Sequence, residues 1–388
     1  MKDSLRIHIL GAGIGGLTTA IALRRAGYAP TVFEQAPALT DVGAGITLGP
    51  NATRVMEELG LAGELEQVAW TPRHAGILHC ATGEPISYRE RGDAYLTEFG
   101  APFWHIHRAD LLEVLGKAAM ASAEIHFGHR LVALRSEGEV VIAEYDNGAV
   151  IESDVLIACN GIKSTVRDTL IEASAPAFTG YVAWRGLVPM TDLPGFEVDP
   201  DFGLYIGPNR MVGRYAVRHR SLLNYVAMAR KPDWCEEGWM VSAEVDEVLA
   251  EFDGWHEDVQ RMIAATPAGA CFKWALHVRE PITQWVSGRV ALLGDAAHPM
   301  TPFLGLGAGI AIEDALVLAR AFEAASGPDD ALQRYQSARV DHANMAQAES
   351  SRQGLYLLNM KPGEPQDRSL FGEDPFGLYG YDARTVAV

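Results

Sequence analysis

The pattern with the clearest chemical meaning is the glycine-rich run GAGIGG at residues 11–16, together with an acidic residue placed after it. An apolar stretch precedes the run, an amphipathic segment follows it, and a second apolar stretch ends at Glu34. In such a unit Gly11 allows a tight turn, Gly13 lets the backbone approach a pyrophosphate, and Gly16 lets the helix pack on the strand. Free N–H groups at the helix start favour an anion, and Glu34 can accept hydrogen bonds from a ribose. The run predicts a dinucleotide site; the alternative is a glycine-rich turn in another βαβ unit.

Three further segments could bring groups to such a site. Residues 43–51 carry several glycines, including Gly45, which suggests backbone lying against a ligand. Arg108 stands where a predicted strand gives way to a helix; it is either a cation near cofactor phosphates or a solvated cation at the helix start. The apolar run 154–158 predicts a buried parallel strand, and the loop after it, 159–167, takes the usual position of a site in an open α/β sheet.

Composition excludes several classes of function. The 388 residues carry a formal net charge of −18, which argues against a nucleic-acid partner and against binding to an anionic membrane. The four cysteines lie far apart without a CxxC pair, so we expect no metal site and no disulfide framework, and a reducing cytoplasm. The N-terminus lacks the cleavage pattern of a signal peptide, and no apolar run approaches membrane-spanning length.

The order of the predicted elements indicates an α/β protein with two interleaved domains. Residues 1–177 form a Rossmann-type nucleotide-binding domain with small β insertions at about 70–105. Residues 178–280 contain aromatic-rich alternating runs, which predict an antiparallel substrate-binding sheet. Residues 281–360 return to the first domain and add C-terminal helices, and residues 361–388 are expected to form a surface tail.

Three motifs together resemble those of one enzyme family. They are GAGIGG with Glu34, ACNGIKSTVR at residues 158–167, and GDAAHPMTPFLGLGAG at residues 294–309, and VAWRGLVP and LYGYDA agree with them. The chain resembles the single-component flavin aromatic hydroxylases, the family of p-hydroxybenzoate, salicylate and 6-hydroxynicotinate hydroxylases. The resemblance implies a Rossmann-type FAD-binding domain interleaved with an antiparallel-sheet substrate domain, plus C-terminal helices.

The resemblance also implies a set of cofactor contacts. The glycine turn would hold the FAD pyrophosphate, Glu34 the adenosine ribose and Asp295 the ribityl chain. The helix that begins near Ala308 would present backbone N–H groups to the flavin, where its N-terminus stabilises the negative charge of the reduced ring. The implied cofactor-binding residues are Gly11, Gly13, Gly15, Gly16, Glu34, Gln35, Gly45, Ile46, Thr47, Arg108, Leu131, Asp295, Gly307, Ala308 and Gly309.

The residues that would meet the substrate are less sharply defined. Tyr215 alternates with its neighbours on a predicted strand and is either a hydrogen-bonding tyrosine at the substrate or a core aromatic. Thr47 is a second catalytic candidate near the flavin, and a plain turn threonine is its alternative. Arg210 could pair with a substrate carboxylate, whereas Pro302 and Phe303 would wall the ring pocket.

Two polar residues and two departures from the family motifs leave alternatives open. Arg185 could also pair with a carboxylate, but an internal ion pair is the favoured interpretation. His298 is interpreted as a structural residue beside a helix. Asn160 replaces the usual aspartate and Leu306 the usual glutamine of the family motifs, which puts the handling of the reductant in doubt.

The implied reaction has two halves. NADH or NADPH reduces FAD, and O₂ then yields a C4a-hydroperoxide that attacks an electron-rich phenol, hydroxybenzoate or hydroxypyridine ring. The expected partners are therefore a small aromatic substrate, O₂ and NAD(P)H, with no nucleic acid and no membrane; a homodimer is one state that the sequence leaves open. The alternatives are an FAD-dependent oxidase, reductase or tailoring epoxidase of the same fold, and a non-catalytic flavin-binding protein.

Overall fold

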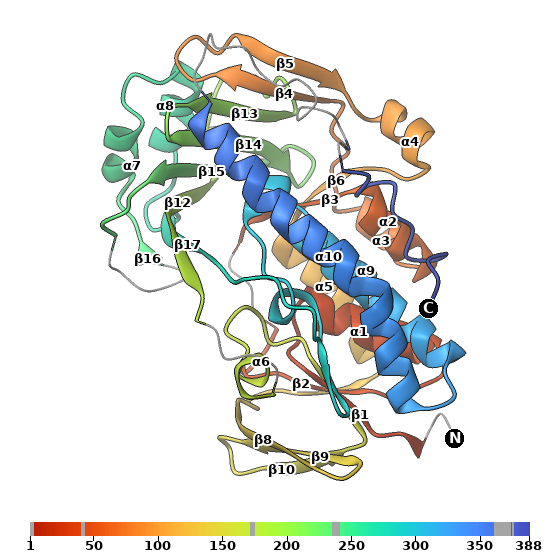
Figure 1. Ribbon diagram of the computed structural model, residues 1–388. Coiled ribbons are helices and arrows are strands. Elements are labelled where there is room, and N and C mark those ends of the chain that lie inside the picture. Colours follow the sequence, from red (N-terminus) through yellow and green to blue (C-terminus); the bar gives the residue numbers. More distant parts are fainter. Residues whose placement is uncertain (1–3, 40–42, 171–174, 235–240, 361–373, 375) are drawn as a thin grey trace.

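The chain folds around two large sheets, one of six strands and one of eight, which lie in different parts of the molecule (Figure 1). The computed structural model describes residues 4–39, 43–170, 175–234, 241–360, 374 and 376–388. No helix of these residues is long and apolar enough to cross a bilayer.

A six-stranded sheet forms the core of the first domain, and its apolar central strands explain its position there. Every residue of β1 and β11 is buried, and these strands pair in parallel with Ile7 beside Val155. The sheet order is β18-β19-β11-β1-β2-β7, parallel except for β18. Its strands are β1 (Ile7–Leu10), β2 (Thr31–Phe33), β7 (Glu124–His126), β11 (Val155–Ala158), β18 (Val286–Ser287) and β19 (Val290–Leu292).

Helices and small sheets surround this core. α1 (Ile14–Arg25) packs against α5 (Arg108–Met120) and α9 (Gly307–Ala324). The small sheets are β8 (Leu131–Glu137), β9 (Val140–Tyr145) and β10 (Val150–Ser153), and the pair β3 (Gly45–Leu48) and β6 (Trp104–His107). The remaining helices on this side are α2 (Pro50–Glu58), α3 (Ala62–Glu66), α4 (Asp93–Phe99), α6 (Thr165–Leu170), and the 3₁₀ turns η3 (Gly294–Ala296) and η4 (Pro302–Leu304).

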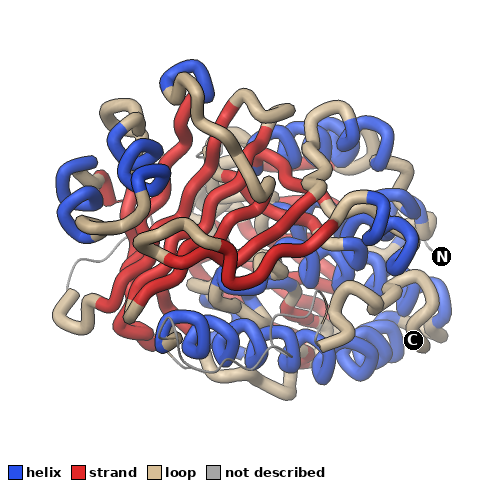
Figure 2. Tube along the Cα trace, turned by 90° about the horizontal axis from the view of Figure 1, so that it is seen from above, coloured by secondary structure: helices blue, strands red, loops and turns tan. Residues whose placement is uncertain are grey.

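An eight-stranded, largely antiparallel sheet forms the second domain, and Figure 2 shows its strands side by side. α7 (Val245–Glu251) and α8 (Glu257–Ala264) cover one face through a cluster that includes Trp184 and Tyr205, and the cavity lies on the other face. The 3₁₀ turn η2 (Met190–Asp192) follows β12. In spatial order the strands are β16 (Val241–Ser242), β17 (Phe272–Val278), β12 (Ala177–Pro189), β15 (Leu222–Arg230), β14 (Arg210–Val217), β13 (Phe202–Gly207), β4 (His74–His79) and β5 (Pro85–Glu90).

The hairpin β4–β5 is placed differently from the sequence expectation. We expected the β runs within 70–105 as insertions of the first domain, but β4 pairs in parallel with β13 and extends the large sheet. The reason is burial: Ala75 and Leu78 of β4 are buried in the second sheet, a partner more than 120 residues away that local periodicity does not show. The mixed α/β architecture with both kinds of sheet and C-terminal helices confirms the predicted fold class.

The C-terminal part of the chain joins the two layers. α10 (Pro328–Asn359) packs on α9 and reaches β13 and β14, so it runs from the first domain to the large sheet (Figure 1). The predicted surface tail 361–388 lies partly outside the described residues, and its end is no surface segment. Leu378 and Ala383 are buried in the core, and Arg54 donates hydrogen bonds to the carbonyl oxygens of Tyr379 and Tyr381.

Candidate active site

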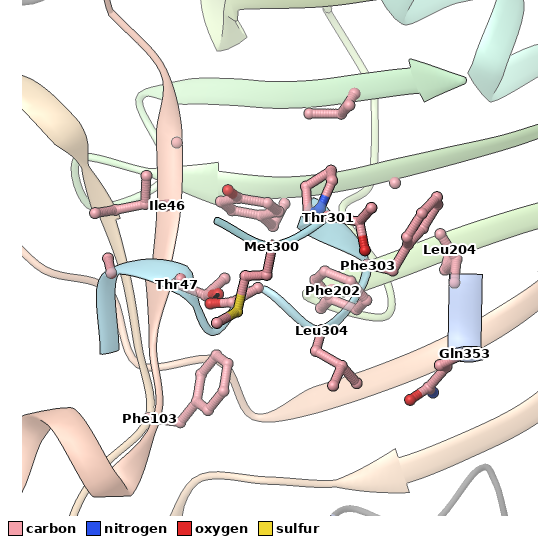
Figure 3. A pocket seen from close by; sticks show the side chains of 18 of the residues that line it. Ile46, Thr47, Phe103, Phe202, Leu204, Met300, Thr301, Phe303, Leu304 and Gln353 are labelled. Atoms are coloured by element: carbon pink, nitrogen blue, oxygen red, sulfur yellow. Dashed lines mark hydrogen bonds between the residues drawn. The ribbon is translucent and has the colours of Figure 1, made fainter. Parts of the chain in front are cut away.

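One cavity of about 630 Å³ lies between the first domain and the inner face of the large sheet. In Figure 3, side chains of β3, of β13 and of the segment 300–304 surround this space, among them Thr47, Phe202 and Phe303. The lining residues that the following argument uses are Gly13, Gly15, Gly45, Ile46, Thr47, Ala75, Ser87, Arg89, Arg91, Arg108, Phe202, Met211, Tyr215, Asp295, Pro302, Phe303, Gly307 and Ala308.

The glycine turn has the geometry that the sequence predicts. Gly11 has φ +104°, and a Cβ on Gly16 would lie 1.9 Å from the carbonyl oxygen of Gly11, so helix α1 can meet the turn this closely only without a side chain. Gly13 differs, because a Cβ there would have no protein atom within 4 Å. Gly13 and Gly15 line the cavity, and the open space at Gly13 borders the N-terminus of α1.

Glu34 closes the turn from the side. Its carboxylate accepts a hydrogen bond from the N–H of Ala12 at 2.6 Å and another from Ala36 at 2.8 Å. Gln35 is exposed beside it, and Leu131 begins β8 in the small sheet. None of Glu34, Gln35 and Leu131 lines the cavity, so their proposed contacts with an adenosine group would lie outside it.

The start of α9 supplies a second helix N-terminus at the cavity. Gly307 and Ala308 line it, whereas Gly309 does not. A Cβ on Gly309 would lie 3.2 Å from Nδ2 of Asn51, so that glycine serves the packing of α2 on α9. The structure thus brings two of the three predicted helix-start residues to the cavity and assigns the third to packing.

Two side chains of opposite charge, Arg108 and Asp295, line the cavity at this end. Burial lowers the pKa of Arg108, nearby Arg185 lowers it further, and the carboxylate of Asp295 opposes both. The Asp295 side chain opens onto the cavity, where desolvation by the surrounding protein raises its pKa while His298 and Arg108 lower it. A cation and an anion near the same wall can hold a ligand that has both phosphate and hydroxyl groups.

Strand β3 forms the wall between the two helix starts. Gly45, Ile46 and Thr47 line the cavity, and Oγ1 of Thr47 donates a hydrogen bond to the carbonyl oxygen of Gly305 at 3.1 Å. The N–H of Gly45 donates to Oδ1 of Asn224 at 2.8 Å, which ties β3 to the large sheet.

Alternation on β14 decides which side chains reach the cavity. Met211, Gly213 and Tyr215 line it, and the ring of Tyr215 packs 4.6 Å from that of His105. Arg210 has the opposite parity and contributes nothing to the cavity wall. Our expectation of Arg210 in the substrate pocket is therefore wrong, because period-two alternation turns it to the outer face.

The contacts of Arg210 on that outer face are with α7 and its surroundings. Its guanidinium donates to the carbonyl oxygen of Glu251, forms an ion pair with the same residue, and lies 6.0 Å from the ring of Trp255. Pro302 and Phe303, by contrast, line the cavity as expected.

Arg185 and His298, the two remaining candidates, contact other side chains of the protein. The guanidinium of Arg185 lies 5.5 Å from the ring of Trp274, and no ion pair of Arg185 occurs within the described ranges, so the favoured internal pair is absent there. His298 is fully buried, and its Nε2 lies 2.6 Å from Oδ2 of Asp314, which also pairs with Arg339. This buried network holds α9 against α10 and agrees with a structural His298.

Sequence reasoning missed two arginines. Arg89 of β5 and Arg91 just after it line the cavity. The parity of Ser87, Arg89 and Arg91 was visible in the sequence, but the pairing that turns them toward the cavity was not.

The residues present fit FAD. The open cradle at Gly13 and the N-terminus of α1 suit a pyrophosphate, and the start of α9 suits the electron-rich edge of a flavin ring. Both features open onto one cavity, so one extended cofactor can reach them together.

Comparisons with known proteins agree with this geometry. The family model described as "FAD binding domain" matches residues 4–350. A 3-amino-4-hydroxybenzoate 2-monooxygenase of Streptomyces platensis is 36% identical, over 98% of this chain and 97% of that protein. A 6-hydroxynicotinate 3-monooxygenase of Bordetella bronchiseptica is 34% identical, over 98% of this chain and 96% of that protein. The crystal structure of Klebsiella pneumoniae HpxO complexed with FAD and uric acid has a TM-score of 0.82 at 26% identity, covering 99% of this chain and 95% of that chain.

Proposed function

The chain belongs to the family of FAD-dependent aromatic monooxygenases, and from this premise we propose that it hydroxylates a small electron-rich aromatic or N-heteroaromatic ring with O₂ and NADH or NADPH. The relatives named above act on an aminohydroxybenzoate and on hydroxynicotinate. Rings of this kind carry a hydroxyl group that donates electron density, which an oxygen electrophile requires.

The observation that carries the proposal is the continuity of the cavity. Gly13, Gly307 and Ala308 line one part of it, and Tyr215 and Phe202 on the sheet line another. A ring bound against the sheet would therefore face a flavin bound along the helix starts. FAD, when bound and reduced, supplies the electrons that activate O₂ for insertion into a ring.

The chain's own groups would orient the reactants and keep the site dry. The start of α9 directs backbone N–H groups toward the negative charge of a reduced flavin. Arg108 and Asp295 border the cofactor side of the cavity. Met211, Phe202 and Phe303 line the cavity with apolar surface, which displaces water from the ring.

Tyr215 would hold a proton rather than give it up. Burial raises the pKa of its phenol, so Oη stays protonated at neutral pH. A protonated Tyr215 can exchange a hydrogen bond with the ring hydroxyl and fix which carbon faces the flavin. In this proposed role, Tyr215 acts through its hydroxyl group and not only as an aromatic ring packed in the core.

Isotope incorporation tests the proposal directly. The purified yellow holoenzyme would be given ¹⁸O₂, NADH or NADPH, and 4-hydroxybenzoate, 3-hydroxybenzoate, 3-amino-4-hydroxybenzoate or 6-hydroxynicotinate in turn. We expect at least one ring to stimulate nicotinamide oxidation and to leave as a product that carries one ¹⁸O atom. Reduction of the flavin by the ring compound under argon, without nicotinamide, would instead establish an oxidase.

A further inference from the structure

Two arginines line the cavity at the edge of the large sheet. Arg89 lies on β5 and Arg91 directly follows this strand, and both line the cavity together with Ser87. Tyr88 and Glu90 have the opposite parity and are exposed. The edge segment therefore turns its cations toward the cavity and its carboxylate toward solvent.

The register of the sheet connects Arg89 with Tyr215. Tyr215 pairs with Phe202, Phe202 with Ala75, and Ala75 with Arg89, so these four residues form one row across β14, β13, β4 and β5. All four line the cavity. With strands about 4.8 Å apart, the row places the backbone of Arg89 about 14 Å from that of Tyr215. The long Tyr215 and Arg89 side chains both line the cavity from the two ends of this row, and the small Ala75 leaves room between them.

Arg91 extends the cationic end of this row. Its guanidinium carbon lies 4.5 Å from the ring centre of Phe103, 5.4 Å from that of Phe202 and 5.6 Å from that of Tyr95. Aromatic faces hold a guanidinium in place while its in-plane N–H groups stay directed at other partners. Burial holds the pKa of His105 well below its usual range and Arg91 lowers it further, so His105 adds no positive charge beside Arg91.

Arg89 carries a positive charge that a bound anion could balance. No acidic side chain within the described ranges forms an ion pair with Arg89, although the chain has 50 Asp and Glu residues. Desolvating a cation at a cavity wall costs free energy unless an anion compensates it. A bound anion would supply that compensation.

We propose that Arg89 and Arg91 bind a carboxylate on the substrate ring and thereby select ring carboxylates over neutral rings. The inference rests on the proposed hydroxylation at this cavity. The row then fits a ring with two polar ends: its hydroxyl lies at Tyr215, its face at Phe202 and its carboxylate at the arginines. The phosphates of a bound dinucleotide would be the alternative anions, but the arginines lie on the sheet edge, whereas the glycine turn and the start of α9 belong to the first domain.

The test compares acid and amide versions of one ring. Dissociation constants of the holoenzyme would be measured from the change in flavin absorbance on titration with 4-hydroxybenzoate against 4-hydroxybenzamide, and 6-hydroxynicotinate against 6-hydroxynicotinamide. The wild-type protein should prefer at least one acid over its amide by about 10-fold or more, as expected for a charge-assisted hydrogen bond. Arg91→Gln and Arg89→Gln should each reduce that ratio severalfold, and Arg91→Lys should retain part of it.

A matched control removes a neighbouring cation outside the cavity. Arg73 is exposed, its carbonyl oxygen accepts the N–H of Arg91, and its side chain does not line the cavity. Arg73→Gln should leave the acid-to-amide ratio unchanged. Should a variant at Arg91 lose its fold, Arg89→Gln and the wild-type ratio still decide the matter.

Each outcome bears on one claim. The arginine assignment is overturned if the wild-type protein binds acid and amide equally, if no acid probe binds, or if the variants keep the wild-type ratio. Incorporation of ¹⁸O is scored separately. Hydroxylation without acid selectivity refutes the arginine assignment alone, whereas acid selectivity without ¹⁸O in the product refutes the hydroxylase alone.

Discussion

Replacing two glycines of the same turn by alanine should affect different properties: Gly16→Ala should lower folding stability, whereas Gly13→Ala should weaken FAD binding. A Cβ at residue 16 would lie 1.9 Å from the carbonyl oxygen of Gly11, whereas real Cβ contacts stay beyond 3.0 Å. Helix α1 would have to move by about 1.1 Å or more, and overpacking of this kind costs about 3 kcal/mol of stability. Gly16→Ala should therefore lower the free energy of unfolding of the apoprotein and weaken FAD binding as a consequence.

Gly13→Ala should affect the ligand alone. No protein atom lies within 4 Å of a Cβ at this position, and the backbone φ of −75° suits alanine. The apoprotein should lose at most about 1 kcal/mol, from a poorer N-cap. If the pyrophosphate lies against this backbone, the added methyl group should cost about 1–3 kcal/mol of binding, which is roughly 5- to 150-fold in the dissociation constant of FAD.

The assay combines thermal unfolding of the apoprotein with titration of FAD by quenching of its fluorescence. Gly63→Ala is a suitable control, because a Cβ there also meets no atom within 4 Å and the residue lies in α3, outside the cavity wall. Wild-type affinity for FAD in Gly13→Ala would refute the placement of the pyrophosphate at this turn.

Four further substitutions test other contacts in the protein. Arg339→Met would remove the arginine that pairs with the buried carboxylates of Glu313 and Asp314 and should cost about 3–5 kcal/mol in a denaturant titration. Burial alone would raise the pKa of Asp314, but His298 and Arg339 lower it to about 2. The ionised carboxylate therefore stabilises the folded state by about 2 kcal/mol above about pH 4, and this stabilisation is lost as the pH falls toward 2. In Asp314→Asn, acid unfolding should lack this pH-dependent loss of stability. Tyr215→Phe should keep FAD affinity and lower kcat/KM for hydroxylation roughly 10- to 100-fold, and an unchanged rate would make Tyr215 a core aromatic. Arg210→Gln should leave the steady-state rate as in the wild type and cost less than about 1 kcal/mol in thermal unfolding; a large loss of activity would contradict its placement on the outer face.

The buried charges of α9 explain how the last helix, α10, helps to position the start of α9 at the cavity. Glu313 accepts from Nδ2 of Asn51 and pairs with Arg339, while Asp314 pairs with Arg339 and accepts from the N–H of Gly294. α10 thus fixes α9 relative to α2 and to the turn that carries Asp295. The N-terminus of α9 depends on these bonds for its position at the cavity.

Local sequence determined the parts of this protein that short-range physics governs. The glycine turn follows from GAGIGG because a Cβ at residue 16 would lie only 1.9 Å from the carbonyl oxygen of Gly11, so this position requires a residue without a side chain. The buried strand β11 follows from its apolar run, and alternation already separates Arg210 from Tyr215, since residues five apart on a strand face opposite sides. The sequence also supported the family, which the comparisons show.

Tertiary structure alone decided which groups meet across the cavity. The parallel pairing of β4 with β13 brings Arg89 into a row with Tyr215, 126 positions along the chain. The pairing of Arg339 with Glu313 and Asp314, and the inward face of β14, depend in the same way on long-range packing. Periodicity indicates which residues share a face of a strand or helix. Which face is buried depends on partners elsewhere in the chain, because the free energy of burying apolar surface comes from surfaces that only the folded chain brings together.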